Sequence, residues 1–143
     1  MLKKLFSLTA ILSVLLILNG CKTVQQASSK EIKPFIGIWK MTNHEGSYVI
    51  FKQDGSFYNI SKEQNNHIVT HSGTFKILDG QTYVLDITYA RTDALYQLAG
   101  KQYVNKFTFA SENRMRMTGV VDGKNGGRSL QWVDELARVT SLD

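Results

Sequence analysis

Two histidines, His67 and His71, have the i, i+4 spacing that pairs zinc ligands on one face of a helix. The residues between them, Ile68-Val69-Thr70, are instead typical of a strand, in which four residues span ~13 Å. The two imidazoles therefore cannot bind one metal ion directly, and we expect no metal site. His71 shares a strand face with Val69 and Phe75, so we expect it to point inward as a structural histidine or as a hydrogen-bonding group for a ligand. A hydrolase or isomerase that uses His71 is a further alternative.

Other motifs that carry chemistry are weak or absent. Asp122-Gly123-Lys124-Asn125-Gly126 resembles the start of a calcium loop, but Lys124 and Gly126 stand where oxygen ligands are required, which predicts a hairpin turn. The sequence contains no nucleophile elbow, metal-ligand cluster or phosphate-binding glycine loop. Asp86 and Asp134 are the remaining acids on predicted strands, and Asp86 is expected on an outer face. We therefore expect a protein that is not an enzyme and that uses no cofactor.

The first 21 residues have the organisation of a bacterial export signal. Lys3 and Lys4 precede an apolar run from Leu5 to Leu18, which is shorter than the ~20 residues that a transmembrane helix needs. Leu18-Asn19-Gly20-Cys21 resembles a lipobox, in which a peptidase cleaves before a cysteine that carries a diacylglyceryl thioether. Cys21 is the only cysteine, so it has no disulfide partner. Residues 1–20 are thus predicted to be a signal peptide, and an acylated Cys21 to anchor the protein in a membrane.

Residues 21–34 are interpreted as the lipidated cysteine and a flexible polar tether, which ends at Pro34, the only proline. The folded domain is predicted to occupy residues 35–143. Lys22, in place of aspartate, resembles the sorting signal that favours the outer membrane over the inner membrane in a Gram-negative-type cell envelope. Basic residues exceed acidic ones by 17 to 12 but are scattered among predicted strands and turns, which argues against a nucleic-acid partner.

Turn signals divide the domain into segments rich in Val, Ile, Thr, Tyr and Phe. The predicted fold is all-β, an eight-stranded up-and-down antiparallel barrel without exposed edges, and a two-sheet sandwich is the alternative. Residues 91–100 differ, because Ala94, Leu95 and Leu98 fit a helical face and predict a short helical segment that partly covers one end of the barrel. The predicted strands lie near residues 37–43, 47–52, 56–61, 67–77, 81–90, 101–110, 113–121 and 128–139.

Alternation along these strands separates an apolar, aromatic inner face from a polar outer face. A barrel of eight strands either fills with side chains or holds one small ligand. Inward polar groups need a partner, so they are where a ligand or a water molecule would be held. The candidates to line a lumen are His71, Tyr83, Tyr89, Asn105, Phe107 and Met117, with Asn59 as a further inward polar group.

The domain opens with Phe35-Ile36-Gly37-Ile38-Trp39, which is similar to the Gly-x-Trp opening of lipocalins. Asp54-Gly55-Ser56-Phe57, Leu98-Ala99-Gly100-Lys101 and the ending Glu135-Leu136-Ala137-Arg138-Val139 extend the resemblance to lipocalin-like domains of bacterial lipoproteins of unassigned function. It covers about residues 35–140 and implies the barrel fold. It also implies that Gly37, Trp39 and Arg138 close one end, with the guanidinium stacked on the indole.

These features together predict a lipid-anchored, lipocalin-like barrel that binds a small apolar ligand in its lumen. The alternative is an envelope interaction module with a filled barrel, which docks a protein or a glycan through its loops or outer face. The sequence identifies neither the ligand nor a protein partner.

Overall fold

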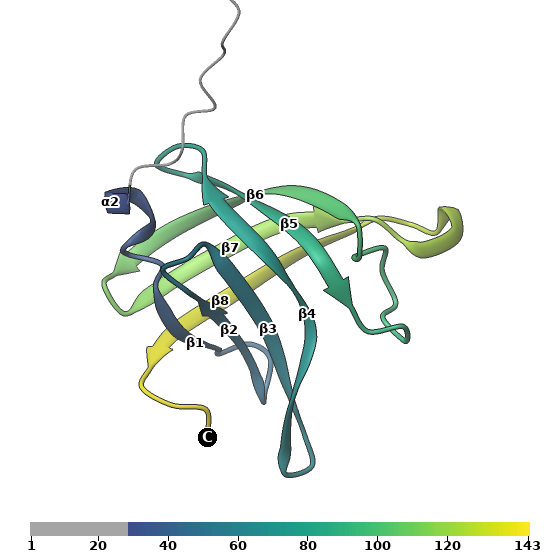
Figure 1. Ribbon diagram of the computed structural model, residues 1–143, viewed down its shortest axis with the longest axis horizontal. Coiled ribbons are helices and arrows are strands. Elements are labelled where there is room, and N and C mark those ends of the chain that lie inside the picture. The colour runs from purple at the N-terminus through teal and green to yellow at the C-terminus, as the bar shows by residue number, and fades with distance from the viewer. Residues whose placement is uncertain (1–28) are drawn as a thin grey trace, which may run out of the picture.

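The computed structural model describes residues 29–143, which form a closed antiparallel barrel of eight strands in up-and-down order (Figure 1). Each strand pairs with the next, and β8 returns to pair with β1, so the sheet closes on itself. The predicted barrel is confirmed, and the sandwich alternative is excluded. The strands are β1 (Gly37–Met41), β2 (Ser47–Phe51), β3 (Ser56–Glu63), β4 (Asn66–Ile77), β5 (Thr82–Ala90), β6 (Lys101–Ser111), β7 (Arg114–Val121) and β8 (Leu130–Val139).

The predicted strand boundaries agree with the observed ones to within two residues. The helical segment predicted for residues 91–100 is wrong, since these residues form turns and a single bridge between Tyr96 and Gly123. A helix needs one continuous apolar face, and Leu95 is 80% exposed whereas Leu98 packs against the core. The described residues instead contain two short helical turns, α2 (Ser29–Ile32) and the 3-10 turn η1 (Lys124–Gly126).

The chain before β1 closes one end of the barrel. Phe35 is 1% exposed, and its ring centroid lies 4.7 Å from that of Phe107 and 5.6 Å from that of Phe51. Ile32, in α2, packs against the same core. The last residues of the predicted tether are therefore folded onto the barrel, because burying Ile32 and Phe35 removes apolar surface from water. Cys21 and the predicted signal peptide lie outside the described residues.

Trp39 and Arg138 complete this end. Trp39 is fully buried and donates its indole N–H to the carbonyl of Phe35 at 2.7 Å. The Arg138 guanidinium lies 4.2 Å from the centre of the Trp39 ring and donates to the carbonyls of Ile36, at 2.5 Å, and Pro34, at 2.7 Å. The expected stack of guanidinium on indole is thus present, and it fastens the segment before β1 to β8.

The backbone conformation and the packing at position 37 both favour a glycine. Its φ of +135° is a conformation that residues with a side chain rarely adopt, and a Cβ atom would lie 2.7 Å from an Arg138 nitrogen. The glycine of the Gly-x-Trp opening therefore leaves room for the Arg138 guanidinium to stack on Trp39.

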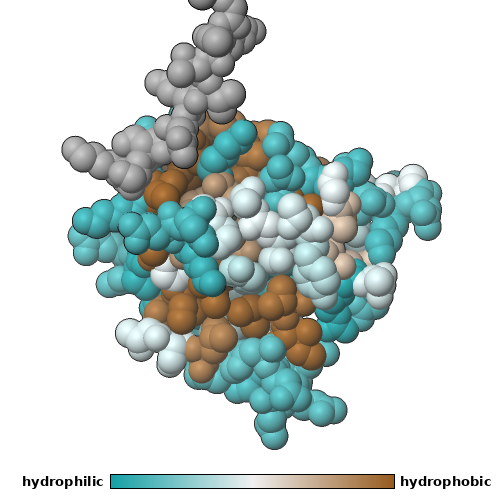
Figure 2. Space-filling model, in the orientation of Figure 1, coloured by the Kyte–Doolittle hydropathy of each residue, from teal (hydrophilic) through white to brown (hydrophobic). Residues whose placement is uncertain are grey.

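Figure 1 shows α2 at one end of the barrel and the connection between β5 and β6, residues 91–100, at the other. Figure 2 shows one face of the molecule, on which hydrophilic and hydrophobic residues are mixed. Hydrophobic residues form a band across the lower half of this face, above a hydrophilic tip. No helix within residues 29–143 is long and apolar enough to cross a membrane.

Candidate functional site

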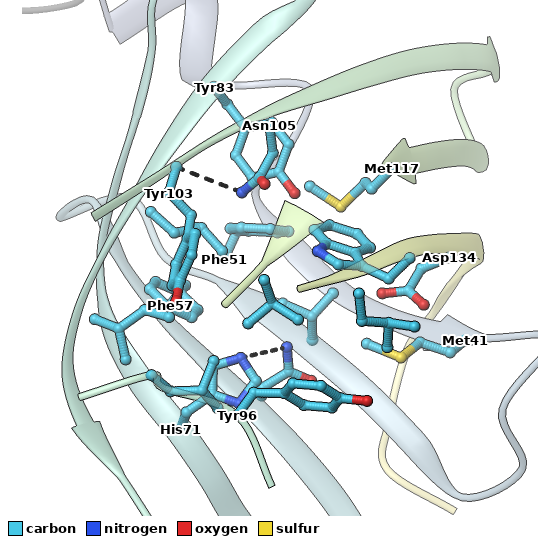
Figure 3. A pocket seen from close by; sticks show the side chains of 18 residues that line it. Met41, Phe51, Phe57, His71, Tyr83, Tyr96, Tyr103, Asn105, Met117 and Asp134 are labelled. Carbon is cyan, nitrogen blue, oxygen red and sulfur yellow. Dashed lines mark hydrogen bonds between the residues drawn. The ribbon is translucent and has the colours of Figure 1, made fainter. Parts of the chain in front are cut away.

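The half of the barrel away from Phe35 is hollow. It contains a cavity of about 260 Å³, whose lining comes from strands around the barrel and from the 91–100 connection (Figure 3). Phe51 and Tyr83 line it and also contact the Phe35 ring, so they form its floor. The lining residues are Met41, Val49, Phe51, Phe57, Asn59, His71, Tyr83, Leu85, Ile87, Tyr96, Leu98, Tyr103, Asn105, Met117, Val121, Leu130, Trp132 and Asp134.

The size and composition of this cavity suit a small organic molecule. Ligand sites usually enclose ~300–1,000 Å³ and combine apolar walls with a few placed polar groups. At about 260 Å³ this cavity lies just below that range, so it fits one ring with a short chain rather than a long acyl chain. Its polar side chains belong to Asn59, His71, Asn105, Asp134 and the tyrosines.

The 91–100 connection covers part of the mouth, as expected, although it is not helical. Tyr96 and Leu98 line the cavity from this segment. The Gln97 amide donates to the carbonyl of Asp122 at 2.9 Å, and the Tyr103 hydroxyl donates to the carbonyl of Gln97. Hydrogen bonds therefore hold this connection against the β7–β8 connection, which makes the covering segment part of the folded barrel.

His71 lies in the wall with its ring nitrogens engaged by neighbours. Its Nε2 lies 3.1 Å from the Asn59 amide nitrogen, and its Nδ1 lies 3.2 Å from the Thr70 hydroxyl oxygen, which donates to the Asn59 carbonyl. The Asn59 amide can only donate, so Nε2 accepts and Nδ1 carries the proton. Burial lowers the pKa of His71 to about 4. The imidazole is therefore neutral near pH 7 and contributes no charge to the cavity.

Asn59 and His71 lie opposite each other on β3 and β4, so their side chains share one face. The pairing of β3 with β4 shifts by one residue between Asn59, which pairs with His71, and Ile60, which pairs with Val69. An extra residue in one strand redirects the side chains beyond it. The bulge therefore lies next to the Asn59–His71 pair, and the contact between these two side chains agrees with strand alternation.

Asn105 lies on β6 and is 2% exposed. Its amide nitrogen is 3.5 Å from the Tyr103 carbonyl oxygen, while its Oδ1 has no hydrogen-bond partner within the described part of the chain. Gly119 makes room for this amide, because a Cβ atom there would lie 2.1 Å from Oδ1 and 2.6 Å from the Trp132 ring. An acceptor is therefore held in the cavity wall with its hydrogen-bonding capacity unused.

Asp134 is a second acceptor, on the inner face of β8 beside Trp132 and the buried Leu136. Its side chain is 19% exposed, and one carboxylate oxygen lies 3.4 Å from Nε2 of His44. Burial raises its pKa, whereas His44 acts in the opposite direction. Burial also raises the pKa of Tyr83 well above its ordinary value, and the Asp134 charge adds to this effect. Tyr83 is therefore a neutral hydroxyl near pH 7.

Four of the six residues predicted to line a lumen do so, namely His71, Tyr83, Asn105 and Met117. Phe107 is buried but packs against Phe35 beneath the cavity floor. Tyr89 is 49% exposed and does not line the cavity, so this prediction is wrong. The pairing of β4 with β5 shifts between Gly73, which pairs with Ile87, and Ser72, which pairs with Tyr89. This β-bulge places Tyr89 on the face of Ser72, opposite to that of His71.

Sequence reasoning missed Trp132, Asp134 and Tyr96. The first two share a strand face with Leu130 and Leu136, so alternation along residues 130–136 was a signal that could have found them. No comparable signal identifies Tyr96, whose position depends on its bridge to Gly123. Within residues 29–143, no cluster of His, Asp or Glu side chains could hold a metal ion.

The protein is thus an eight-stranded antiparallel barrel with an apolar cavity at one end. Residues 19–142 match the family model described as a domain of unknown function, DUF4488. The match covers most of the chain, which therefore belongs to this family. A comparison with curated proteins finds no match.

Proposed function

We propose that this protein is a non-enzymatic, lipocalin-like binding protein that takes up a small, largely apolar molecule in the lumen of its barrel. The observation that carries the proposal is the cavity of about 260 Å³, with apolar walls and a few inward polar groups. A barrel that acts only through its outer surface has no need of such a space, since filling it would add packing and stability. The cavity therefore favours ligand binding over an interaction module.

We further propose that the barrel works at a membrane, held there by acyl chains on Cys21, in the envelope of a Gram-negative-type bacterium. The lipobox-like Leu18-Asn19-Gly20-Cys21 and the preceding apolar leader support this location. Two or three acyl chains give a stable anchor, because each buried methylene contributes ~0.8 kcal/mol. The binding domain would thus act close to the lipid surface.

The chain contains its own reporter for a test of the cavity. Trp39 and Trp132 are its two tryptophans, and only Trp132 lines the cavity, while Trp39 is buried beneath Arg138. The probe 4-bromobenzyl alcohol is neutral, has one ring and quenches nearby indole through its bromine atom. We expect saturable quenching in the full chain in detergent and its loss in Trp132→Phe. Quenching that rises linearly without saturation, as in free solution, would exclude the cavity as a binding site.

Two neighbouring valines provide matched variants. Val121 lines the cavity, whereas Val120 is 46% exposed on the outside of the same strand. Val121→Phe fills the space and should weaken probe binding at least tenfold, while Val120→Phe should leave it unchanged. Should Val121→Phe fail to fold, Leu98→Phe and the exposed Leu95→Phe make the same comparison on the covering segment. Equal binding by both members of a folded pair would contradict the proposal.

A further inference from the structure

The cavity wall presents acceptors that the protein leaves without adequate donors. Asn105 Oδ1 is buried and has no partner in residues 29–143. Asp134 presents a carboxylate that lies 3.4 Å from Nε2 of His44, whose side chain is 56% exposed. A buried acceptor without a donor is costly, so a ligand that supplies N–H or O–H groups at these positions gains affinity.

Strand pairing brings the two acceptors to one side of the cavity. On β7, Met117 pairs with Asp134, and Gly119, over which Asn105 Oδ1 lies, pairs with Trp132. Figure 3 shows Asn105, Met117 and Asp134 across the cavity from His71 and Tyr96. Asn105, on β6, and Asp134, on β8, thus line the cavity from the two strands that flank β7.

The charge of the lining selects among ligands. No Lys or Arg is among the lining residues of the described chain, His71 is neutral near pH 7, and Asp134 supplies the negative charge. A carboxylate ligand would lose its hydration and meet the Asp134 charge without a compensating cation. A cationic ligand would instead pair with Asp134, and Trp132 offers an aromatic face beside it.

We propose that the ligand of this cavity is a small apolar amine, whose ammonium group binds between the Asp134 carboxylate and Asn105 Oδ1. This inference rests on the proposed function and adds the chemical class of the ligand. The apolar part of the amine lies against Phe57, Leu85 and Trp132, and the ammonium ion supplies the donors that both acceptors need.

Three probes of similar shape test the preference: 2-phenylethylamine, 2-phenylethanol and 3-phenylpropionate, titrated calorimetrically into the full chain in detergent at pH 7.5. A titration into micelles alone is subtracted. We expect the amine to bind at least tenfold more tightly than the alcohol, and the carboxylate to bind most weakly. An alcohol or carboxylate that binds as tightly as the amine would overturn the inference.

Two carboxylates on β8 give a matched pair of variants. Asp134→Asn keeps the side-chain shape on the inner face, and Glu135→Gln makes the same change on the outer face, where Glu135 lies 3.3 Å from Arg116. Asp134→Asn should weaken amine binding at least tenfold and alcohol binding less than twofold, while Glu135→Gln should change neither. Asn105→Leu should weaken amine binding three- to tenfold. An unchanged amine affinity in Asp134→Asn would overturn the inference.

The outcomes separate the two proposals. If 4-bromobenzyl alcohol binds at Trp132 but the amine is not the tightest of the three probes, the lumen is a ligand site and only the amine assignment fails. If neither that alcohol nor any of the three probes binds, the proposed function fails together with the inference.

Discussion

At the scale of single residues, His71 shows how the cavity wall avoids a positive charge. Its imidazole accepts from Asn59 through Nε2 and contacts Thr70 through Nδ1, so the neutral form has a partner at each nitrogen. A protonated ring would place an N–H against the Asn59 amide and would lose hydration in the wall. Asp134, by contrast, keeps an acceptor on the inner face, where one of its carboxylate oxygens lies 3.4 Å from Nε2 of His44. The two residues leave the cavity neutral on one side and negative on the other.

The low pKa of His71 predicts a pH-dependent stability. In the unfolded chain the imidazole titrates near 6.5, whereas in the folded protein its pKa is about 4. The unfolded state therefore binds a proton first as the pH falls, and stability is lost between about pH 6.5 and pH 4. By pH 4.5 this loss should reach about 2 kcal/mol, and His71→Gln should abolish it. Urea unfolding at pH 7.5 and pH 4.5 measures the effect.

The exposed His67 supplies the control for this measurement. His67→Gln removes an imidazole from the same strand without touching the cavity wall, so its pH dependence should equal that of the wild type. A His71→Gln variant with the same pH dependence as the wild type would show that protonation of His71 is not linked to folding.

At the scale of elements, the mouth of the barrel is built from two connections that stabilise each other. The β5–β6 connection bridges to the β7–β8 connection at Tyr96 and Gly123, and the Lys124 ammonium donates to the carbonyl of Thr92 at 3.1 Å. Tyr103, on β6, contacts both, because its hydroxyl donates to the Gln97 carbonyl and lies 3.4 Å from the Asp122 amide. Opening of the mouth therefore requires these contacts to break together.

Removing the Tyr103 hydroxyl should loosen the mouth without disturbing the barrel. A net hydrogen bond contributes ~1 kcal/mol, so Tyr103→Phe should raise the exchange rate of the Gln97 amide about fivefold by favouring local opening. Amides in the centres of β6 and β7 should exchange as in the wild type. Hydrogen exchange followed by mass spectrometry or NMR provides the measurement. Tyr89→Phe removes a hydroxyl from an exposed ring and is the matched control, and equal Gln97 exchange in both variants would contradict the prediction.

At the scale of the whole molecule, the barrel has one sealed end and one hollow end. Phe35, Trp39 and Arg138 seal the end at which the chain enters, while the cavity lies toward the 91–100 connection. Residues 29–36 therefore join the barrel at its sealed end, away from the cavity mouth.

Lipid anchoring through Cys21 is a prediction that cell fractionation can test. Cys21→Ser removes the thiol that would carry the diacylglyceryl group, so the protein should lose palmitate labelling and move from the membrane fraction to the soluble fraction. Ser28→Ala, which changes a residue in the predicted tether and keeps the thiol, should remain with the membrane. A Cys21→Ser protein that stays in the membrane fraction after a high-salt wash would contradict lipid anchoring.

Much of the fold could be predicted because strands and turns have local signatures. Turn residues and period-two alternation identified all eight strands, and the Gly37-x-Trp39 opening pointed to the contact with Arg138. The same local rule failed at Tyr89, which has inward parity but follows a β-bulge that pairs it with Ser72. The helix predicted from local residue types at residues 91–100 is also absent, because this segment instead contacts the β7–β8 connection.

The sequence by itself determined the strand order and most of the inner face of the barrel, since both are written in neighbouring residues, while the export signal with Cys21 stays a prediction. Only the tertiary structure decided that the lumen is open, that Asn105 Oδ1 has no donor, and that Asp134 faces the same cavity. These features depend on which side chains meet across the barrel and on how much space they leave. Register, bulges and packing between distant strands set that space, and local patterns of residue type do not record it.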